Sequence, residues 1–516
     1  MIRRPSFKTV LLSCTACVTL AAGSARADLI PSDLIISAST FVPNTGEAAG
    51  LTAGQPITVA GTPEPASPPG GPTAIAVATD ANLGVFTNSS ADSNFGITAP
   101  LTLLSVNPTT GTVDQSLTLP TSQIVTSFSS KSEGSLSLSQ DGHSLNIVGY
   151  HVTTDAYTPS PVGALDVSNA STTAFVDTGL AAGNSARTDN RTVATIGYNG
   201  TTTTTDLNAY SGNNGRAVQQ YNGIFYTVGN ANLGNTGVEE LVPGTPAGST
   251  PNSAQVGQFN TTQVGNKADK VIKDNNFRGE TIYNNTLYVT KGSGSNGIDT
   301  VYQVGAAGAL ANGANLPTGP GTPITVLPGF PTAPAKTTAD YTPFGLFFAN
   351  PTTLYVSDEG TGDAADNGVG SHAGLEKWSL INGTWKLDYT LQAGLIGTAQ
   401  SYNAPGFDGT VTEGGLRDIY GQVNADGTVT IYGITATTDN IPNMDNGADP
   451  NEVVDITDTI GATTLPTSES FNVLEGPILG TVYRGVSDAP IPEPASIGIL
   501  MSAMAGIRLL RRRRAA

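Results

Sequence analysis

Thr286-Leu287-Tyr288-Val289 and Thr353-Leu354-Tyr355-Val356 are near-copies of one short apolar segment, and they start 67 residues apart. Each follows a turn rich in Asn or Pro, and each combines the β-branched, aromatic and aliphatic residues that favour strands. Weaker copies recur along the chain at residues 84–87, 145–148, 224–227 and 429–432. The repeat predicts a fold built from similar strand units.

Most copies stand second in a recurring order of strand, turn, strand, loop, strand, turn and strand, which is the order of one β-propeller blade. The copies are separated by 61 to 79 residues and predict six blades with loops of uneven length. The residues that anchor the six predicted second strands are Phe86, Ile147, Tyr226, Tyr288, Tyr355 and Ile431.

The two ends of the body carry strand patterns that these copies do not use. Residues 34–38 resemble a second strand, and residues 482–486 resemble a first strand. If they join one sheet, they form a seventh blade, and the ring closes through its termini without an open sheet edge. The sequence therefore predicts an all-β fold, a β-propeller of seven four-stranded blades. A β-sandwich array is the alternative, whereas a parallel β-helix would show a tighter repeat.

Residues 1–27 have the features of a secretory signal peptide. A basic start precedes an uncharged, mostly apolar or small stretch at residues 9–22. Ala25 and Ala27 place small residues at the two positions that a signal peptidase reads, so we expect cleavage before Asp28.

Two other export routes fit the same segment less well. The Arg3-Arg4 pair invites a twin-arginine signal, but the Phe that follows is one residue too late. Cys14 or Cys17 could accept lipid, but the apolar run before Cys14 is short. Because both cysteines lie in the signal, the mature chain is expected to lack disulfides and thiol chemistry.

The C-terminal 26 residues carry a second sorting pattern. Pro492-Glu493-Pro494 precedes an apolar stretch, residues 495–507, and the cluster Arg511-Arg512-Arg513-Arg514 follows. This order resembles the PEP-CTERM sorting tail of Gram-negative bacteria. The resemblance implies cleavage by an exosortase after transient membrane insertion of the tail as a helix. It also implies a place in the cell envelope, on the outer surface or in the extracellular matrix, and an association with exopolysaccharide. An ordinary tail anchor or a disordered basic tail is the alternative.

The predicted organisation is thus a signal peptide at 1–27, an exported propeller-like body at 28–490 and a sorting tail at 491–516. Without the two signals, the body keeps 14 basic residues against 40 acidic residues, a net charge of about −26. Such a body repels nucleic acid. Its candidate charged partners are cations, above all Ca²⁺.

One loop concentrates carboxylates in a way that suits a calcium ion. Glycines alternate with acidic residues there, and oxygen ligands on an adaptable backbone favour Ca²⁺ over a transition metal. The candidate ligands are Asp358, Glu359, Asp363 and Asp366. A weaker acidic cluster spans residues 439–449 of the next repeat. Neither matches the EF-hand spacing, and a merely solvated acidic loop is the alternative.

Four arginines recur where first strands are predicted, each near a glycine. Because first strands line the central channel of a propeller, these arginines could form a cationic channel rim. They are Arg216, Arg278, Arg417 and Arg484. The alternative is inter-blade ion pairs with neighbouring carboxylates such as Glu413 or Asp418.

Catalytic residues are not assigned. His143, His151 and His372 are the histidines of the chain, and none lies in a recognisable triad or zinc motif. The sequence therefore favours an exported surface or matrix protein with a non-enzymatic binding or structural role. A Ca²⁺-dependent secreted propeller hydrolase, acting on phosphate or ester substrates, is the second hypothesis.

Overall fold

A computed structural model describes most of the body of the chain. The residues described are 28–59, 62–63, 78, 80–82, 84–86, 97–128, 130–154, 158–165, 189–210, 214–230, 237–247, 252–259, 276–292, 297–333, 341–362, 371–404, 407–440, 443–444 and 447–493. The predicted signal peptide and the sorting tail beyond Glu493 lie outside these residues. No helix within the described ranges is long and apolar enough to cross a membrane.

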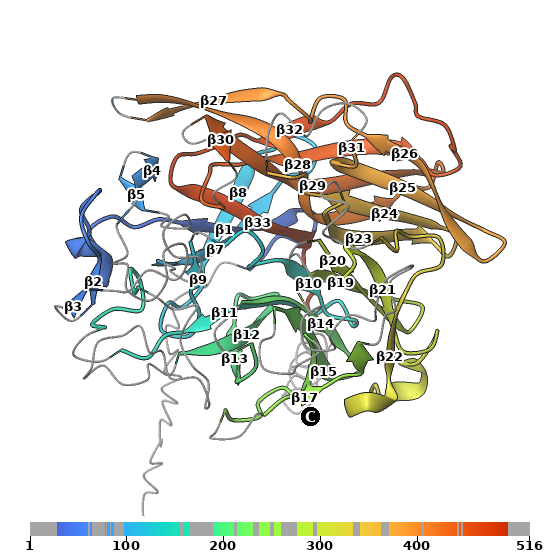
Figure 1. Cartoon of the computed structure of the whole chain (residues 1–516), viewed down its shortest axis with the longest axis horizontal. Coiled ribbons are helices and arrows are strands. Elements are labelled where there is room, and N and C mark those ends of the chain that lie inside the picture. Colours follow the sequence, from blue (N-terminus) through green and yellow to red (C-terminus); the bar gives the residue numbers. More distant parts are fainter. Residues whose placement is uncertain are drawn as a thin grey trace, which may run out of the picture.

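Six of the sheets formed by the described residues are arranged as blades around an axis (Figure 1). Three two-stranded sheets lie outside the blades, and two of them are β2 (Thr58–Val59) with β3 (Thr62–Pro63) and β6 (Thr98–Ala99) with β9 (Thr126–Ser127). From the innermost strand outward, blade 1 consists of β33 (Thr481–Asp488), β1 (Leu34–Thr40), β7 (Leu101–Val106) and β8 (Val113–Thr118). Blade 2 consists of β10 (Leu136–Leu138), β11 (Ser144–His151), β12 (Asn190–Gly197) and β13 (Thr202–Leu207). Blade 3 consists of β14 (Gly215–Tyr221), β15 (Ile224–Gly229), β16 (Val238–Leu241) and β17 (Ala254–Gln255).

The other three blades complete the ring. Blade 4 consists of β19 (Phe277–Tyr283), β20 (Thr286–Lys291), β21 (Thr300–Val304) and β22 (Pro323–Val326), with β18 (Gln258–Phe259) added outside β22. Blade 5 consists of β23 (Pro343–Asn350), β24 (Thr353–Asp358), β25 (Gly374–Ile381) and β26 (Thr384–Leu391). Blade 6 consists of β28 (Phe407–Val423), β29 (Thr428–Asn440), β31 (Val453–Thr459) and β32 (Asn472–Glu475), with β27 (Ala399–Ala404) and β30 (Asn443–Met444) as additions.

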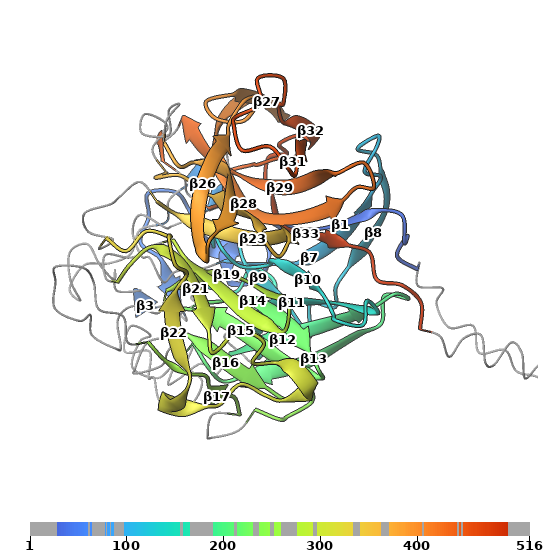
Figure 2. The same cartoon turned by 90° about the vertical axis from the view of Figure 1, so that its right-hand side faces the viewer.

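The ring closes through the two ends of the body, as the sequence predicts. β1 pairs antiparallel with β33, and Ile36 lies opposite Val486. The blue β1 and the dark red β33 lie side by side in both views (Figures 1 and 2). The innermost strands follow one another in the order β33, β10, β14, β19, β23 and β28, and β28 contacts β33 again.

The predicted blade number is wrong, because the described residues form six blades and not seven. Five of the six internal anchors lie on second strands as predicted, but Phe86 does not. It lies on β5 (Val85–Phe86), which pairs with β4 (Asp80–Asn82) in a separate two-stranded sheet. This pair belongs to a long insertion between β1 and β7 of blade 1, so the segment resembles a second strand without forming a blade.

The repeated apolar segment is buried on both of its faces. Leu287 and Val289 on β20 join the core between blades 3 and 4, whereas Tyr288 packs against the core between blades 4 and 5. The copy on β24 does the same one blade later, with Tyr355 in the core between blades 5 and 6. Alternate side chains of a strand point to opposite faces, so a second strand needs apolar residues at successive positions.

The innermost strands approach one another closely where residues are small. A Cβ added to Gly279 on β19 would lie 2.3 Å from the carbonyl oxygen of Phe344 on β23. A Cβ added to Gly485 on β33 would lie 2.4 Å from the backbone nitrogen of Leu136. Side chains are excluded at these positions, which explains why glycines accompany the recurring arginines.

Hydroxyl groups join consecutive blades at the same level. In each case a residue on a second strand donates to a backbone carbonyl of the next blade. The oxygen–oxygen distance is 2.6 Å for Ser37 and for Thr290. The pairs are Ser37 to Gly134, Thr290 to Phe344 and Ser357 to Arg417. The recurrence shows that Gly134, Phe344 and Arg417 occupy equivalent positions of the repeat.

Candidate functional site at the arginine end of the channel

The axis of the ring contains a cavity of about 210 Å³. All six innermost strands contribute to its lining, with Ser135, Ala217, Gly279, Gly345, Asp418 and Val486 among the residues at one level. Ala217, Gly279 and Asp418 directly follow Arg216, Arg278 and Arg417. Ser135 and Gly345 directly follow Gly134 and Phe344, which occupy the position of Arg417 in their own repeats. The arginines therefore lie at one end of the cavity, although their side chains do not line it.

The four arginines are on innermost strands, as the sequence predicts, and all four are buried. Their exposed fractions are 6% for Arg216, 8% for Arg278, 5% for Arg417 and 5% for Arg484. Arg216 and Arg278 lie near the start of β14 and β19, whereas Arg417 and Arg484 lie midway along β28 and β33. These positions place the four side chains between neighbouring blades. Burial of a guanidinium is costly unless carboxylates or hydrogen bonds compensate it, so the partners of each arginine decide what this end of the channel can do.

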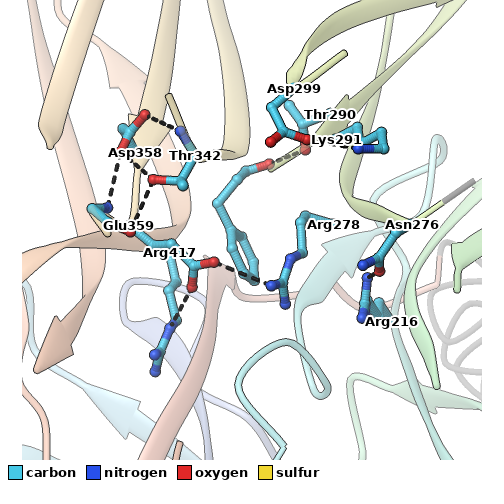
Figure 3. Close-up of polar contacts among 12 residues, drawn as sticks. Arg216, Asn276, Arg278, Thr290, Lys291, Asp299, Thr342, Asp358, Glu359 and Arg417 are labelled. Atoms are coloured by element: carbon cyan, nitrogen blue, oxygen red, sulfur yellow. Dashed lines mark hydrogen bonds and ion pairs between the residues drawn. The ribbon is translucent and has the colours of Figure 1, made fainter. Parts of the chain in front are cut away.

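Glu359 bridges two of the arginines from two different blades (Figure 3). Its Oε1 lies 3.3 Å from Nη2 of Arg278 on blade 4, and its Oε2 lies 3.2 Å from Nε of Arg417 on blade 6. Glu359 itself directly follows β24 of blade 5. One carboxylate thus links three consecutive blades. These contacts are inter-blade ion pairs, the alternative to a cationic channel rim in the sequence analysis. Their carboxylate is Glu359 and not Glu413 or Asp418.

Arg484 has partners for most of its donors. Its Nε donates to Ser39 Oγ at 2.6 Å, and its Nη1 and Nη2 donate to the carbonyls of Ser130 and Phe128 at 2.5 and 2.6 Å. Glu133 is the carboxyl whose charge acts on this arginine. Arg484 therefore serves to hold the loop before blade 2 against the closing strand.

Glu133 was not predicted, although it directly precedes the repeat position of the arginines. It is buried, and it accepts hydrogen bonds from Tyr150 Oη, from Asn214 Nδ2 at 2.6 Å and from Ser127 N at 3.1 Å. Burial is the largest effect on the pKa of Glu133 and raises it, although Tyr150 and Arg484 act in the opposite direction. Glu133 could have been identified from the repeat, because it immediately precedes Gly134, and Gly134 occupies in blade 2 the position that Arg417 occupies in blade 6.

Arg216 differs from the others because it has no carboxylate in ion-pair contact among the residues described. Its Nη1 donates to Asn276 Oδ1 and to the carbonyl of Phe277, the latter at 2.7 Å. Within the described part of the chain, its Nε has no hydrogen-bond partner, and neither does Nε of Arg278. Burial lowers the pKa of Arg216 well below its usual range, and the nearby positive charge of Arg278 is the next cause. Two buried cations therefore repel each other at this end of the channel.

The two candidate calcium ligands that the structure describes already have partners. Asp358 accepts hydrogen bonds from Thr342 N at 2.7 Å, Thr342 Oγ1 at 2.6 Å and Gly360 N at 2.9 Å. Burial, followed by the nearby charge of Glu376, raises the pKa of Asp358 to about 7. Glu359 bridges the arginines, and Asp363 and Asp366 lie outside the described residues. Within those residues no group of three His, Cys, Asp or Glu side chains could hold a metal ion.

The two carboxylates that the sequence offered as arginine partners have other surroundings. Asp418 lines the cavity and accepts a hydrogen bond from Val486 N at 3.1 Å. Burial raises the pKa of Asp418 to about 7. The pKa of Glu413 is also raised, first by burial and then by the neighbouring Glu452. Arg417 lowers the pKa of Glu413, but in the described part of the chain Glu359 is the carboxylate in ion-pair contact with Arg278 and Arg417.

Each histidine makes a polar contact with a carboxylate or a backbone carbonyl, and the ring of His372 also packs edge-on against Tyr341. His151 Nδ1 lies 2.9 Å from Asp206 Oδ2, and this hydrogen bond is the largest cause of the raised pKa of His151. His372 contacts Glu376. His143 Nδ1 lies 3.0 Å from the carbonyl oxygen of Ile491.

The two ends of the body meet on the surface of blade 2. Ile491 N donates to the carbonyl of Gly142 at 2.8 Å, and the next residues, Pro492 and Glu493, are exposed. Asp28 and these two residues line one surface cavity of about 700 Å³. The other predicted processing residues, Ala25, Ala27, Pro494 and the four terminal arginines, lie outside the described residues.

Comparisons with known proteins add no family. No protein-family model matches the chain. No curated protein matches it either. Solved structures with which it aligns include a Saccharomyces cerevisiae complex of Dbp5 bound to Nup159, Gle1, IP6 and ADP, at 11% identity and a TM-score of 0.29 over 70% of this chain and 92% of that chain. The isolated N-terminal domain of Nup159 aligns at 10% identity and a TM-score of 0.29 over the same shares.

A further alignment is with a quinonprotein alcohol dehydrogenase-like protein from Bacteroides thetaiotaomicron VPI-5482. The identity is 8% and the TM-score 0.31, over 76% of this chain and 85% of that chain. At these scores the alignments carry no functional information. The propeller assignment rests on the sheet order and the closed ring described above.

Proposed function

We propose that the chain is an exported cell-surface or extracellular-matrix protein with a non-enzymatic binding or structural role, and that an exosortase removes its tail. The observation that carries this proposal is the exposure of Pro492 and Glu493 directly after the last docked residue, Ile491. A protease that reads an extended segment needs it outside the folded body, and two prolines keep this segment extended. The ring ends where the sorting motif begins.

The polar contacts at the arginine end of the channel support a structural role for the acidic residues there. Asp358 holds the turn after β24 through hydrogen bonds to Thr342 and Gly360, and Glu359 links blades 4, 5 and 6. These carboxylates hold the ring together, so a cation would have to displace existing partners. Exopolysaccharide remains the proposed partner of the exported body, on the resemblance of the tail.

Mass spectrometry of the protein exported by a Gram-negative host tests the processing. We expect a mature chain that starts at Asp28 and lacks the residues beyond the Pro492-Glu493-Pro494 region. A Glu493→Ala variant should retain the tail, whereas the control Glu475→Ala, on β32, should be processed normally. Recovery of the intact arginine tail on exported wild-type protein would show that the sorting prediction is wrong.

A further inference from the structure

The arginine end of the channel has more buried positive charge than its neighbours balance. Four guanidiniums gather there, and Glu359 is the carboxylate in direct contact with two of them. Three further carboxyls are close to the group, and each has other partners among the described residues. Glu133 contacts Tyr150 and Asn214, Asp299 pairs with Lys291, and Glu413 adjoins Glu452. In a body with about 14 basic and 40 acidic residues, such an excess is not a consequence of composition.

Arg216 and Arg278 hold the uncompensated part of this charge. Arg216 contacts an amide and a backbone carbonyl, which are neutral, and Arg278 has one ion pair at 3.3 Å. Among the residues that the structure describes, the Nε donor of each is buried without a hydrogen-bond partner. A buried donor without a partner is destabilising, and two such donors on neighbouring cations are more so. Figure 3 shows Arg278 lying between Arg417 and Arg216, with Glu359 on the Arg417 side.

A guanidinium with free N–H groups is the side chain best suited to bind a carboxylate, sulfate or phosphate group. We propose that one oxyanion, either inorganic or carried by an acidic sugar, binds between Arg216 and Arg278. The anion occupies the side of Arg278 that Glu359 does not serve and accepts hydrogen bonds from the two Nε groups. It replaces the missing carboxylate and joins blades 3 and 4 as Glu359 joins blades 4, 5 and 6.

The site suits the end group of a ligand and not a polymer chain, because both arginines are more than nine-tenths buried. If an acidic sugar carries the oxyanion, the inference rests on the proposed association with exopolysaccharide. The protein would then recognise a uronate or sulfate group of that polysaccharide. If the source is inorganic, the ion is a structural part of the propeller. The two sources differ in what else they present to the protein, so they can be separated by experiment.

Sulfate is the first probe, applied to the purified exported protein. A saturating concentration should raise the melting temperature by about 2–3 °C more than NaCl at equal ionic strength. Sulfate also stabilises proteins by exclusion from their surfaces, so a variant must separate the two effects. Arg216→Gln should lose the saturable part of the rise, whereas Lys386→Gln, which removes one charge from an exposed position of β26, should keep it.

Calorimetric titration of the wild-type protein gives an independent measure that does not depend on the variants folding. We expect one saturable sulfate per chain, with affinity reduced at least tenfold in Arg216→Lys, which keeps the charge but loses the fork of donors. Absence of saturable binding to the wild type, or equal binding by the Arg216→Gln variant, would overturn the proposal.

Glucuronate identifies the source of the anion, with glucose as the neutral control. Competition between glucuronate and sulfate supports an acidic sugar, and sulfate binding without competition supports an inorganic ion. Neither result depends on the tail, so the site and the proposed processing can fail separately.

Discussion

Glu359 is the residue whose loss should reveal how the blades are joined. Glu359→Gln leaves Arg278 and Arg417 buried without their carboxylate, and breaking a buried ion pair costs about 3–5 kcal/mol. The Gln carbonyl can still accept one hydrogen bond, which retains about 1 kcal/mol. We therefore expect the free energy of unfolding to fall by about 2–4 kcal/mol. With an unfolding entropy of about 2.1 cal/mol/K per residue, the melting temperature of the body should fall by about 2–4 °C.

Urea unfolding, monitored by tryptophan fluorescence, measures this loss in the free energy of unfolding with probes in blade 5 itself. The chain has two tryptophans, Trp378 and Trp385, and both are buried in blade 5, the blade from which Glu359 projects. Asp114→Asn, at an exposed position of β8, controls for the change in net charge. A double-mutant cycle with Arg417→Gln should give a coupling of more than about 1 kcal/mol. A loss in Glu359→Gln no larger than in Asp114→Asn would refute the bridging role, since exposed ion pairs contribute less than about 1 kcal/mol.

Three further outcomes follow from the structure. Burial raises the pKa of Asp418 from 3.8 to about 7, so the folded state binds this proton more tightly than the unfolded state. The contribution of Asp418 to stability should therefore be greatest below about pH 4 and be lost as the pH rises to about 7, by at most about 4 kcal/mol. Urea unfolding between pH 4 and 8 should show a flatter profile for Asp418→Asn than for the wild type. Gly279→Ala should cost about 1–3 kcal/mol in the same assay because its Cβ would meet a backbone carbonyl of the next blade, whereas Gly461→Ala, with no atom within 4 Å of its Cβ, should be close to neutral. Because Asp358 and Glu359 already have protein partners, we expect millimolar Ca²⁺ and NaCl at equal ionic strength to raise the melting temperature equally; a larger rise with Ca²⁺ that is lost in Asp363→Asn combined with Asp366→Asn would instead support the calcium site that the sequence predicts.

The second strands were predictable because burial on both faces leaves a local signature. Leu287, Tyr288 and Val289 are apolar at successive positions since one face packs on each neighbouring blade. The segment around Phe86 carries a similar signature in a two-stranded sheet, which is why the predicted blade number exceeded the six that the described residues form. Composition of one short strand does not distinguish a blade from a hairpin in an insertion.

The partners of the arginines were not predictable from the sequence. Arg417 and Glu359 are 58 positions apart, and the chain between them contains the two outer strands of blade 5, the added strand β27 and the first part of β28. Burial and blade order decide which of the 41 acidic residues reaches each guanidinium. By contrast, the hydroxyls of Thr290 and Ser357 directly follow the two repeated apolar segments, so their inter-blade role could have been noticed as part of the repeat.

Closure of blade 1 has a consequence for the time course of folding. Arg484 on β33 and Ser39 on β1 contact each other across 445 positions of the chain, and closing a flexible loop of that length costs about 5 kcal/mol of chain entropy. A growing chain that ends before β33 can assemble blades 2 to 6, but it leaves the edge of β1 without its inner neighbour. The first blade is thus completed by the last of the described strands to be synthesised, so the ring closes late in synthesis.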